Sequence, residues 1–456
     1  MSYPVSSLLQ KQHHLERVAF ICQNRRLTWQ QCLRHIAQLA AYLKQQPVSR
    51  WVLICENAYA FCIGFFALLQ TDKTIILPPD NQINTLKQLL PGAILSDNPQ
   101  NYAELNCLRT NIFGHSNHTG WQFKPVDNQR LCLELFTSGS TGKAKSVSKK
   151  LCQLEAEIQQ HEELWGSQSS DSVILSTVTH QHIYGLLFYL LRPLCYGRTI
   201  VSETIQFPDS LIKSALQFDK ITLISSPTHL NRLPELIDMS VLRPHISCIF
   251  SSGAPLSNNA ALAIQKSIGQ TPVEVYGSTE TGGIAYRCQN SPTATLWQCF
   301  DKVNIAVNPQ EQTLIVQSPF LADEQPFQTS DIVSCLNDKQ FILQGRNDRI
   351  IKLEGKRINL NEVEYLLKQH DFVFEAVAIK LSRHREMLAA AIVLTTEGQN
   401  FLLVNGHKKL NRILINQIKN NIEHIALPRY WRYIDNIPSN LQGKVLTYQL
   451  EQLFTQ

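Results

Sequence analysis

The residues best suited to chemistry lie in one nine-residue stretch, 137–145, which reads TSGSTGKAK. It holds four hydroxyl side chains, two glycines and two lysines. Glycines let backbone N–H groups approach an anion closely, hydroxyls add donors and lysines supply positive charge. The stretch therefore predicts a phosphate-binding loop, and a flexible surface loop is the alternative. It is not a Walker A motif, because Gly139 and Gly142 lack the four-residue gap of that motif.

The elements around this loop alternate along the chain. The apolar run 131–136 (LCLELF) directly precedes the loop and predicts a buried strand. Further strands are predicted at residues 51–54, 74–77, 94–95, 172–175, 199–201, 221–225, 248–251 and 274–276. Helices are predicted at residues 25–44 (with Thr28 as the N-cap), 58–69, 86–90, 151–164 and 184–191. This alternation predicts an α/β fold with a mostly parallel sheet that helices cover on both faces.

The last third of the chain has a different pattern. Short strands at residues 304–307, 313–317 and 341–343 predict a small antiparallel subdomain. Beyond them, a small α+β part is predicted from helices at 360–368 and 410–422 and strands at 373–380 and 387–394.

Polar or glycine-rich loops follow several predicted strands, at residues 176–185, 251–256 and 276–280. In open α/β sheets, ligands bind outside the carboxyl ends of the strands. We therefore expect these loops and the phosphate-binding loop to surround one ligand.

Composition limits the class of protein. A chain of 456 residues corresponds to about two or three domains. With 44% hydrophobic and 17% charged residues, the chain is typical of a globular protein and not of a disordered one. Its apolar run 58–69 is too short to span a bilayer, and its first residues lack the pattern of a signal peptide. The twelve cysteines include no C-x-x-C pair, so we expect reduced thiols and a cytoplasmic location.

The net charge of +5 is unevenly placed. From Arg349 to the C-terminus there are 15 Lys and Arg against 10 Asp and Glu, which accounts for the whole excess. The basic clusters there are Lys380, Arg383 and Arg385, and Lys408, Lys409 and Arg412. This excess indicates either ordinary solvated charge or a polyanionic partner for the C-terminal part.

Five segments together resemble the motifs of the adenylate-forming ligases. In chain order they are residues 137–145, 276–280 (YGSTE), 329–331 (TSD), 345–352 (GRNDRIIK) and 443–444 (GK). That superfamily of AMP-binding enzymes includes acyl-CoA synthetases, aryl-acid ligases, the adenylation domains of nonribosomal synthetases and firefly luciferase. The resemblance implies a large N-terminal adenylation domain, residues 1–347, and a small mobile α+β C-terminal domain, residues 348–456, that carries the catalytic lysine.

The resemblance also implies the residues that bind the nucleotide. The phosphates would be held by Thr137, Ser138, Gly139, Ser140, Thr141, Gly142 and Lys145. Ala144 and Ser146 stand where the family usually has proline and glycine. The adenine would lie between Tyr276 with Gly277 and the segment Gly253, Ala254 and Pro255.

The remaining nucleotide contacts are carboxylate, hydroxyl and cation contacts. Thr279 would bond the α-phosphate and Glu280 would hold Mg²⁺, for which one carboxylate suffices beside phosphate oxygens. Asp331 would accept hydrogen bonds from the ribose hydroxyls, and Arg346 would also contact the ribose. A strand-end turn for Asp331 and a surface ion pair for Arg346 are the alternatives.

The resemblance places the hinge at Asp348 and the catalytic lysine at Lys444, although Asn440 and Thr447 replace the usual threonine and arginine nearby. Lys444 would neutralise charge between the carboxylate and the α-phosphate. The acyl pocket would be lined by His182, Ile183, Gly185, Gly283 and Ile284. A metal site at His180 and His182 is the competing interpretation.

These observations predict an ATP-dependent carboxylic acid ligase that forms an acyl-adenylate and then a thioester. ATP and Mg²⁺ would be its cofactors, and CoA or a carrier-protein phosphopantetheine would supply the thiol. Since the predicted pocket carries no charged side chain, we expect an aryl or medium-chain acid. A carrier protein is the expected macromolecular partner, and nucleic acid is not. The alternative is a non-catalytic nucleotide-binding descendant that acts as a sensor or scaffold.

Overall fold

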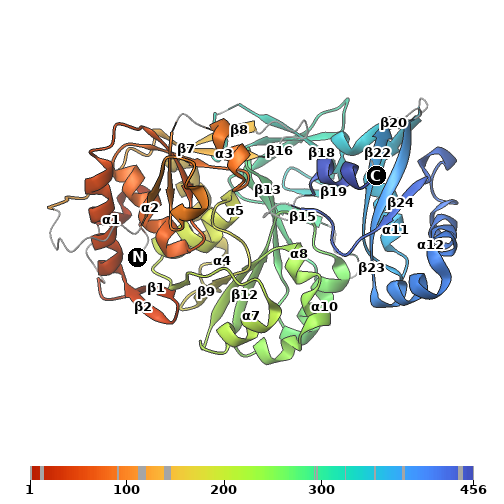
Figure 1. Cartoon of the computed structure of the whole chain (residues 1–456), viewed down its shortest axis with the longest axis horizontal. Coiled ribbons are helices and arrows are strands. Elements are labelled where there is room, and N and C mark those ends of the chain that lie inside the picture. The colour runs from red at the N-terminus through yellow and green to blue at the C-terminus, as the bar shows by residue number, and fades with distance from the viewer. Residues whose placement is uncertain are drawn as a thin grey trace.

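Within the part of the chain that the structure describes, the strands form four sheets, of thirteen, six, three and two strands. The computed structural model describes residues 3–10, 15–89, 92–110, 120–137, 145–291, 293, 296–323, 325–353, 356–382, 386–439 and 445–454. In Figure 1 the elements that follow residue 350, in blue, lie together at one end of the molecule, and the earlier elements form the larger part.

The six-stranded sheet carries the predicted phosphate-binding loop. Its spatial order is β6 (Cys107–Arg109), β5 (Ala93–Ser96), β3 (Arg50–Ile54), β4 (Thr74–Leu77), β7 (Leu131–Thr137) and β8 (Lys145–Lys150). Neighbouring strands are parallel except β7 and β8, which form an antiparallel hairpin. Strand β8 was not predicted, because its sequence KSVSKK contains one apolar residue.

Two helices near the N-terminus illustrate how sequence determines burial. Helix α2 (Ala58–Gln70) is buried at every position from Ala58 to Leu69, as expected for a helix that is apolar on all sides. Helix α1 (Trp29–Leu43) begins at the predicted N-cap, Thr28, which forms a capping box with Gln31. The four residues before α1 form strand β2 (Arg25–Thr28), so this part of the helix prediction is wrong. No helix within the described residues is long and apolar enough to cross a membrane.

The thirteen-stranded sheet carries the other predicted ligand loops. Its spatial order is β16 (Asn304–Val307), β17 (Thr313–Gln317), β18 (Phe327–Cys335), β19 (Gln340–Arg346), β15 (Leu296–Cys299), β14 (Gly282–Cys288), β13 (Val273–Ser278), β12 (Ile246–Ser251), β11 (Ile221–Ser225), β9 (Val173–Ser176), β10 (Ile200–Val201), β1 (Val18–Cys22) and β2. In this spatial order, β13, β12, β11, β9, β10 and β1 pair in parallel. Pairing is antiparallel between β1 and β2 and between all neighbours from β13 through β14 to β16. The predicted antiparallel region is therefore confirmed, but it begins earlier, at β14, and continues the same sheet.

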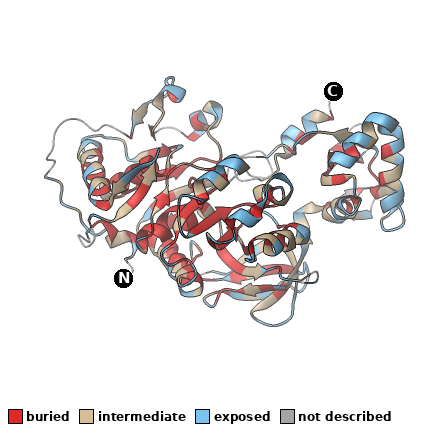
Figure 2. Ribbon diagram, turned by 90° about the horizontal axis from the view of Figure 1, so that it is seen from below, coloured by how far each residue is buried: buried red, intermediate tan, exposed pale blue. Residues whose placement is uncertain are grey.

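Helices cover these sheets and join them through one large core. The helices are α3 (Ile83–Leu89), α4 (Leu151–Trp165), α5 (Ile183–Gly185), α6 (Arg192–Cys195), α7 (Pro208–Ala215), α8 (Pro227–Leu230), α9 (Leu233–Leu236) and α10 (Asn258–Ile268). One hydrophobic cluster contains residues of both sheets and of α1, α2 and α4. In Figure 2 the buried residues follow the sheets through the larger part of the molecule. The predicted helix 184–191 is a buried π-helix over Leu186–Leu191.

The C-terminal elements have cores of their own. They are β20 (Ile350–Leu353), β21 (Lys356–Asn359), α11 (Leu360–Lys368), β22 (Val373–Ser382), β23 (Glu386–Leu394), α12 (Thr396–Ile418), β24 (Tyr430–Tyr433) and α13 (Thr447–Leu453). Two hydrophobic clusters, made of residues beyond 350, involve the three-stranded sheet β22-β23-β24. Helix α12 starts earlier than predicted and bends at Gly406, where φ is 74°.

Candidate functional site

Four of the predicted nucleotide-binding and hinge residues lie in one chain of hydrogen bonds. The hydroxyl of Tyr276, on β13, donates to Asp331 Oδ2 on β18 at 2.6 Å. Arg346 Nη1, at the end of β19, lies 3.4 Å from Asp331 Oδ1. The same guanidinium donates twice to Asp348, at 2.8 and 2.6 Å. Residues 276, 331 and 346 are thus brought together from three strands of one sheet, because Asp331 and Arg346 are register partners.

The electrostatics of this chain favour a fixed carboxylate. Burial raises the pKa of Asp331, while the Tyr276 hydroxyl and the Arg346 cation act in the opposite direction. The hydrogen bonds to Asp348 raise the pKa of Arg346, which stays charged. The Tyr276 ring packs against Trp297 and Phe341, with centroids 5.4 and 5.8 Å away. An aromatic face held beside an oriented carboxylate is suited to a base and a ribose diol.

Thr279 and Glu280 lie in the tight turn that joins β13 to β14. The hydroxyls of Ser278 and Thr281 bond across this turn at 3.1 Å. Gly277 has no room for a side chain, since a Cβ would lie 2.2 Å from the carbonyl oxygen of Gly282. The turn therefore presents Thr279 and Glu280, both half-buried, at the carboxyl end of β13.

The segment Gly253–Ala254–Pro255 follows the neighbouring strand, β12, and its three residues are exposed. Gly253 has a φ of 97°, which favours glycine. Ser252 Oγ donates to Val275 O at 2.7 Å, so this segment is tied to the strand that carries Tyr276. Because β12 and β13 are parallel, the segment and Tyr276 lie at the same edge of the sheet.

The predicted phosphate-binding loop and the predicted catalytic lysine lie largely outside the described residues, which exclude 138–144 and 440–444. Their flanks are described. Thr137 and Lys145 are register partners at the open end of the β7–β8 hairpin. Ser439 and Val445, the described residues on either side of 440–444, form an antiparallel bridge. The proposed contacts of Ser138, Gly139, Ser140, Thr141, Gly142 and Lys444 stay predictions.

The predicted acyl end of the site is tightly packed. His180 is buried and its Nε2 donates to the carbonyl of Cys55 at 2.9 Å. Burial lowers the pKa of His180 to about 4 and that of His182 to about 3, so both imidazoles are neutral near pH 7. A Cβ on Gly185 would lie 2.0 Å from Thr179 O, so only glycine fits there. Ile183, next to His182, is half-buried.

Gly283 and Ile284 are buried on β14. A Cβ on Gly283 would lie 2.5 Å from Phe300 Cε2 and 3.1 Å from Glu157 Oε1. Gly283 therefore abuts the core, and its place in an acyl pocket stays a prediction.

Metal binding at the paired histidines finds no support in the described part of the chain. No group of three or more His, Cys, Asp or Glu is placed there to hold a metal ion. His180 is instead engaged with a backbone carbonyl. Glu280 alone suits Mg²⁺, which takes one or two carboxylates and completes its shell with water and phosphate oxygens.

Several buried polar residues next to the site escaped the sequence analysis. They are Lys149 on β8 and Gln153, Glu157 and His161 on α4. Their spacing of four residues places those of α4 on one face of the helix. A polar stripe at this spacing is usually solvent-exposed, so only its position between apolar residues of a core helix could have signalled burial.

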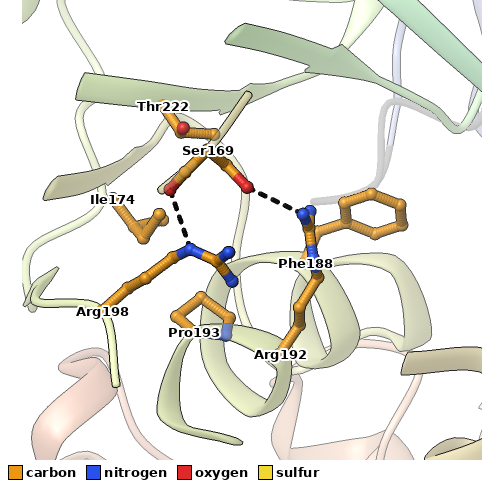
Figure 3. A pocket seen from close by; sticks show the side chains of 7 residues that line it. All are labelled: Ser169, Ile174, Phe188, Arg192, Pro193, Arg198 and Thr222. Atoms are coloured by element: carbon orange, nitrogen blue, oxygen red, sulfur yellow. Dashed lines mark hydrogen bonds between the residues drawn. The ribbon is translucent and has the colours of Figure 1, made fainter. Parts of the chain in front are cut away.

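A pocket elsewhere in the large part is lined by Arg192, Arg198 and Ser169, whose hydrogen bonds Figure 3 shows. Arg198 Nε donates to Ser169 O and Arg192 Nη2 donates to Ser169 Oγ, both at 2.8 Å. Both guanidiniums also bond Glu162, whose pKa falls below its usual value although burial raises it. The cluster stabilises the packing of α4 against α6 and contains no residue of the predicted site.

Comparisons with known proteins identify the family of the chain. Residues 83–312, half of the chain, match the family described as AMP-binding enzyme. Bacitracin synthase 3 of Bacillus licheniformis is 23% identical over 483 residues, an alignment that covers 94% of this chain and 7% of that protein. The chain thus spans a small fraction of that relative's length. Luciferin 4-monooxygenase of Luciola mingrelica is 26% identical over 496 residues, which cover 92% of this chain and 88% of that protein.

Solved structures share the fold. ATP-bound MatB from Rhodopseudomonas palustris superposes with a TM-score of 0.83 at 15% identity, covering 100% of this chain and 99% of the other. The o-succinylbenzoate CoA synthetase of Bacillus subtilis, in complex with its acyl-adenylate intermediate, gives 0.75 at 18% identity, covering 99% and 98%.

Proposed function

Since the chain belongs to the AMP-binding enzyme family, we propose that it is an ATP-dependent carboxylic acid ligase that forms an acyl-adenylate and then a thioester. The observation that carries this proposal is the linked set Tyr276, Asp331, Arg346 and Asp348. Asp331 is half-buried, and desolvation of its carboxylate costs free energy that the bonds from Tyr276 and Arg346 offset only in part. Binding the ribose and base of ATP is the use that the geometry fits best.

The residues divide the first half-reaction between them. Asp331 accepts hydrogen bonds from the ribose hydroxyls, and Tyr276 packs on the base. Thr279 donates a hydrogen bond to the α-phosphate. Glu280 would hold Mg²⁺, which when bound neutralises phosphate charge. Lys444 neutralises the charge that develops between the attacking carboxylate and the α-phosphate. The phosphate-binding loop after β7 holds the departing pyrophosphate.

Asp348 is the proposed hinge between residues 1–347 and 348–456. Next to it, Arg346 bonds Asp331 on the large part, whereas Arg349 bonds Asn361 and Glu364 on α11. On one side of Asp348 the chain is thus anchored to the large part, and on the other side it is anchored to α11. Rotation there would exchange the face that carries Lys444 for another face in the second half-reaction.

The proposed acid is aryl or medium-chain. The predicted acyl end contains neutral histidines, glycines and aliphatic side chains, none of which balances the charges of a zwitterionic amino acid. The proposed acceptor is the phosphopantetheine thiol of a carrier protein, with CoA as a poorer acceptor. Lys408, Lys409 and Arg412 are exposed and suit an acidic partner, whereas Lys380 is paired with Glu386 at 2.6 Å and contributes less. Arg383 and Arg385 lie outside the described residues.

Product analysis tests this proposal. The protein is incubated with MgATP, a panel of acids and either holo carrier protein or CoA at equal concentration, and thioesters are measured by mass spectrometry. We expect aryl or medium-chain thioesters, formed faster on the carrier. Nucleotide binding without any acyl-adenylate would instead identify a non-catalytic nucleotide-binding protein. Efficient use of CoA and poor use of carrier would identify an ordinary acyl-CoA synthetase.

A further inference from the structure

Three buried side chains hold the backbone beneath the Thr279–Glu280 turn. Lys149 Nζ donates to the carbonyl oxygens of Glu280 at 2.9 Å and Phe320 at 2.7 Å. Gln153 donates to the carbonyl of Leu321. Glu157 Oε1 accepts the backbone N–H of Gly283 at 2.7 Å. We call Lys149, Gln153 and Glu157 the brace.

The brace joins the two sheets that carry opposite sides of the nucleotide site. Lys149 lies on β8, which begins directly after the phosphate-binding loop, and Gln153 and Glu157 lie on α4. Their partners are Glu280 in the turn between β13 and β14, Gly283 on β14, and Phe320 and Leu321 in the segment after β17. The brace therefore connects β8 and α4 to the turn that presents Thr279 and Glu280.

The energetic cost of this arrangement indicates a purpose beyond packing. Lys149 is 1% exposed and Glu157 is 4% exposed. Burial lowers the pKa of Lys149, which the Glu157 and Glu280 carboxylates oppose. Burial raises the pKa of Glu157 to about 7, against the opposing effects of Lys149 and the Gly283 N–H. Burial of two ionisable groups costs free energy of desolvation. Apolar residues of similar volume at such positions often stabilise the folded state as much or more.

The contact between α4 and the turn is also tight. Gly282 has a φ of 69°, and a Cβ there would lie 2.6 Å from Glu157 Oε2. The glycine lets the backbone approach the carboxylate closely, so Glu157 determines the position of the first residues of β14.

We propose that Lys149, Gln153 and Glu157 are positioning residues that fix Thr279 and Glu280 relative to the β7–β8 hairpin. This proposal rests on the proposed adenylation function. It assigns no contact between the brace and the substrate.

The test is Lys149→Met, which keeps the length of the side chain but removes its charge and donors. Lys73→Met is the matched control, because Lys73 is also buried and also donates to two backbone carbonyls, those of Gln46 and Val48. Lys73 precedes β4 and so lies at the end of that strand opposite to the predicted loop, which follows the parallel neighbour β7. ATP–pyrophosphate exchange and the rise of Tm on addition of MgATP are measured for both. We expect Lys149→Met to lower kcat for exchange at least tenfold and to lose most of the MgATP-induced rise of Tm. Lys73→Met should lower the Tm of the free protein and leave both readouts unchanged.

The proposal is overturned if Lys149→Met matches Lys73→Met in both readouts. If the wild-type protein catalyses no exchange, the proposed function fails, and the MgATP-induced rise of Tm still tests the brace.

If Lys149→Met does not fold, Glu157→Gln replaces it. The groups that face Glu157 are Lys149 on β8 and His161 on α4, whose Nε2 is 3.7 Å away. Since the pKa of Glu157 is about 7, wild-type exchange should fall below this pH, and Glu157→Gln should be lower above pH 7 and lack this fall. An unchanged rate and pH profile would contradict the proposal.

Discussion

The nucleotide end and the acyl end of the candidate site are built differently. At the nucleotide end, half-buried polar side chains are fixed by one another, as in the 2.6 Å bond from Tyr276 to Asp331. At the acyl end, His180 is neutral and buried, and Gly185 lies against the backbone with no room for a Cβ. The first arrangement suits a ligand that is the same in every member of a family. The second places specificity in core residues, where each change also affects folding.

The largest effect is expected from Lys444→Ala, which removes the proposed charge neutralisation from the first half-reaction alone. Adenylation should fall by about 10²–10³-fold, as for loss of other preorganised electrostatic groups. Thioester formation from supplied acyl-adenylate should be largely unaffected. Both half-reactions are measured separately, with Lys419→Ala, at an exposed lysine on the same part of the chain, as a control. Equal loss of both half-reactions would show that Lys444 acts otherwise.

A smaller effect is expected from Asp331→Asn, which keeps the shape but removes the charge. Charged hydrogen bonds contribute about 1.5–3 kcal/mol, so the KM for MgATP should rise about tenfold to a hundredfold. Tyr276→Phe removes only the hydroxyl that bonds the Asp331 carboxylate, so it should raise the KM for MgATP less than Asp331→Asn does. Steady-state kinetics measures both variants. If Tyr276→Phe were the more damaging, the hydroxyl itself would contact the nucleotide.

We expect His180, at the predicted acyl end, to make the free energy of unfolding depend on pH. The pKa of His180 is about 4 when folded and 6.5 in the unfolded reference, so the unfolded state binds more protons between these values. Stability is therefore complete above pH 6.5 and is lost as the pH falls towards 4. Between pH 7 and pH 5 the loss from this residue is about 2 kcal/mol. His180→Gln should remove that part of the fall in urea unfolding experiments, and an unchanged fall would show that His180 can ionise in the folded protein.

The smallest effect is expected from the basic surface of α12. Replacing Lys408 and Lys409 by Ala should slow transfer to a carrier protein a few-fold at low salt and leave transfer to CoA nearly unchanged. Surface charges act mainly on association rates and are screened by salt. The ratio of carrier to CoA turnover is measured at low and high ionic strength. If this ratio changes neither with the substitutions nor with ionic strength, these lysines do not steer the carrier protein.

Short motifs and regular alternation made much of the architecture predictable. Thr28 capped the predicted helix, and β3, β4, β11 and β13 lie where apolar runs placed them. Strand β8 was missed because Lys149 is buried through hydrogen bonds to distant carbonyls, a compensation that no local pattern reveals. Strand β2 was missed because its pairing with β1 depends on a turn at Gln23 and Asn24, both with positive φ.

The same distinction applies to the site. The motifs located Tyr276, Asp331 and Arg346, but their bond network depends on the register of β18 and β19, which is a property of the folded sheet. The polar residues of α4 could not be found from motifs, because their partners are backbone groups more than a hundred residues away.

The central claim is that this chain activates a carboxylic acid with ATP, and ATP–pyrophosphate exchange tests it most directly. Exchange is measured with the wild-type protein, MgATP and a panel of aryl, medium-chain and amino acids. We predict exchange that requires an added acid and is strongest with an aryl or medium-chain acid. Absence of acid-dependent exchange from a protein that still binds MgATP would contradict the claim, and preference for a zwitterionic amino acid would contradict the proposed substrate class.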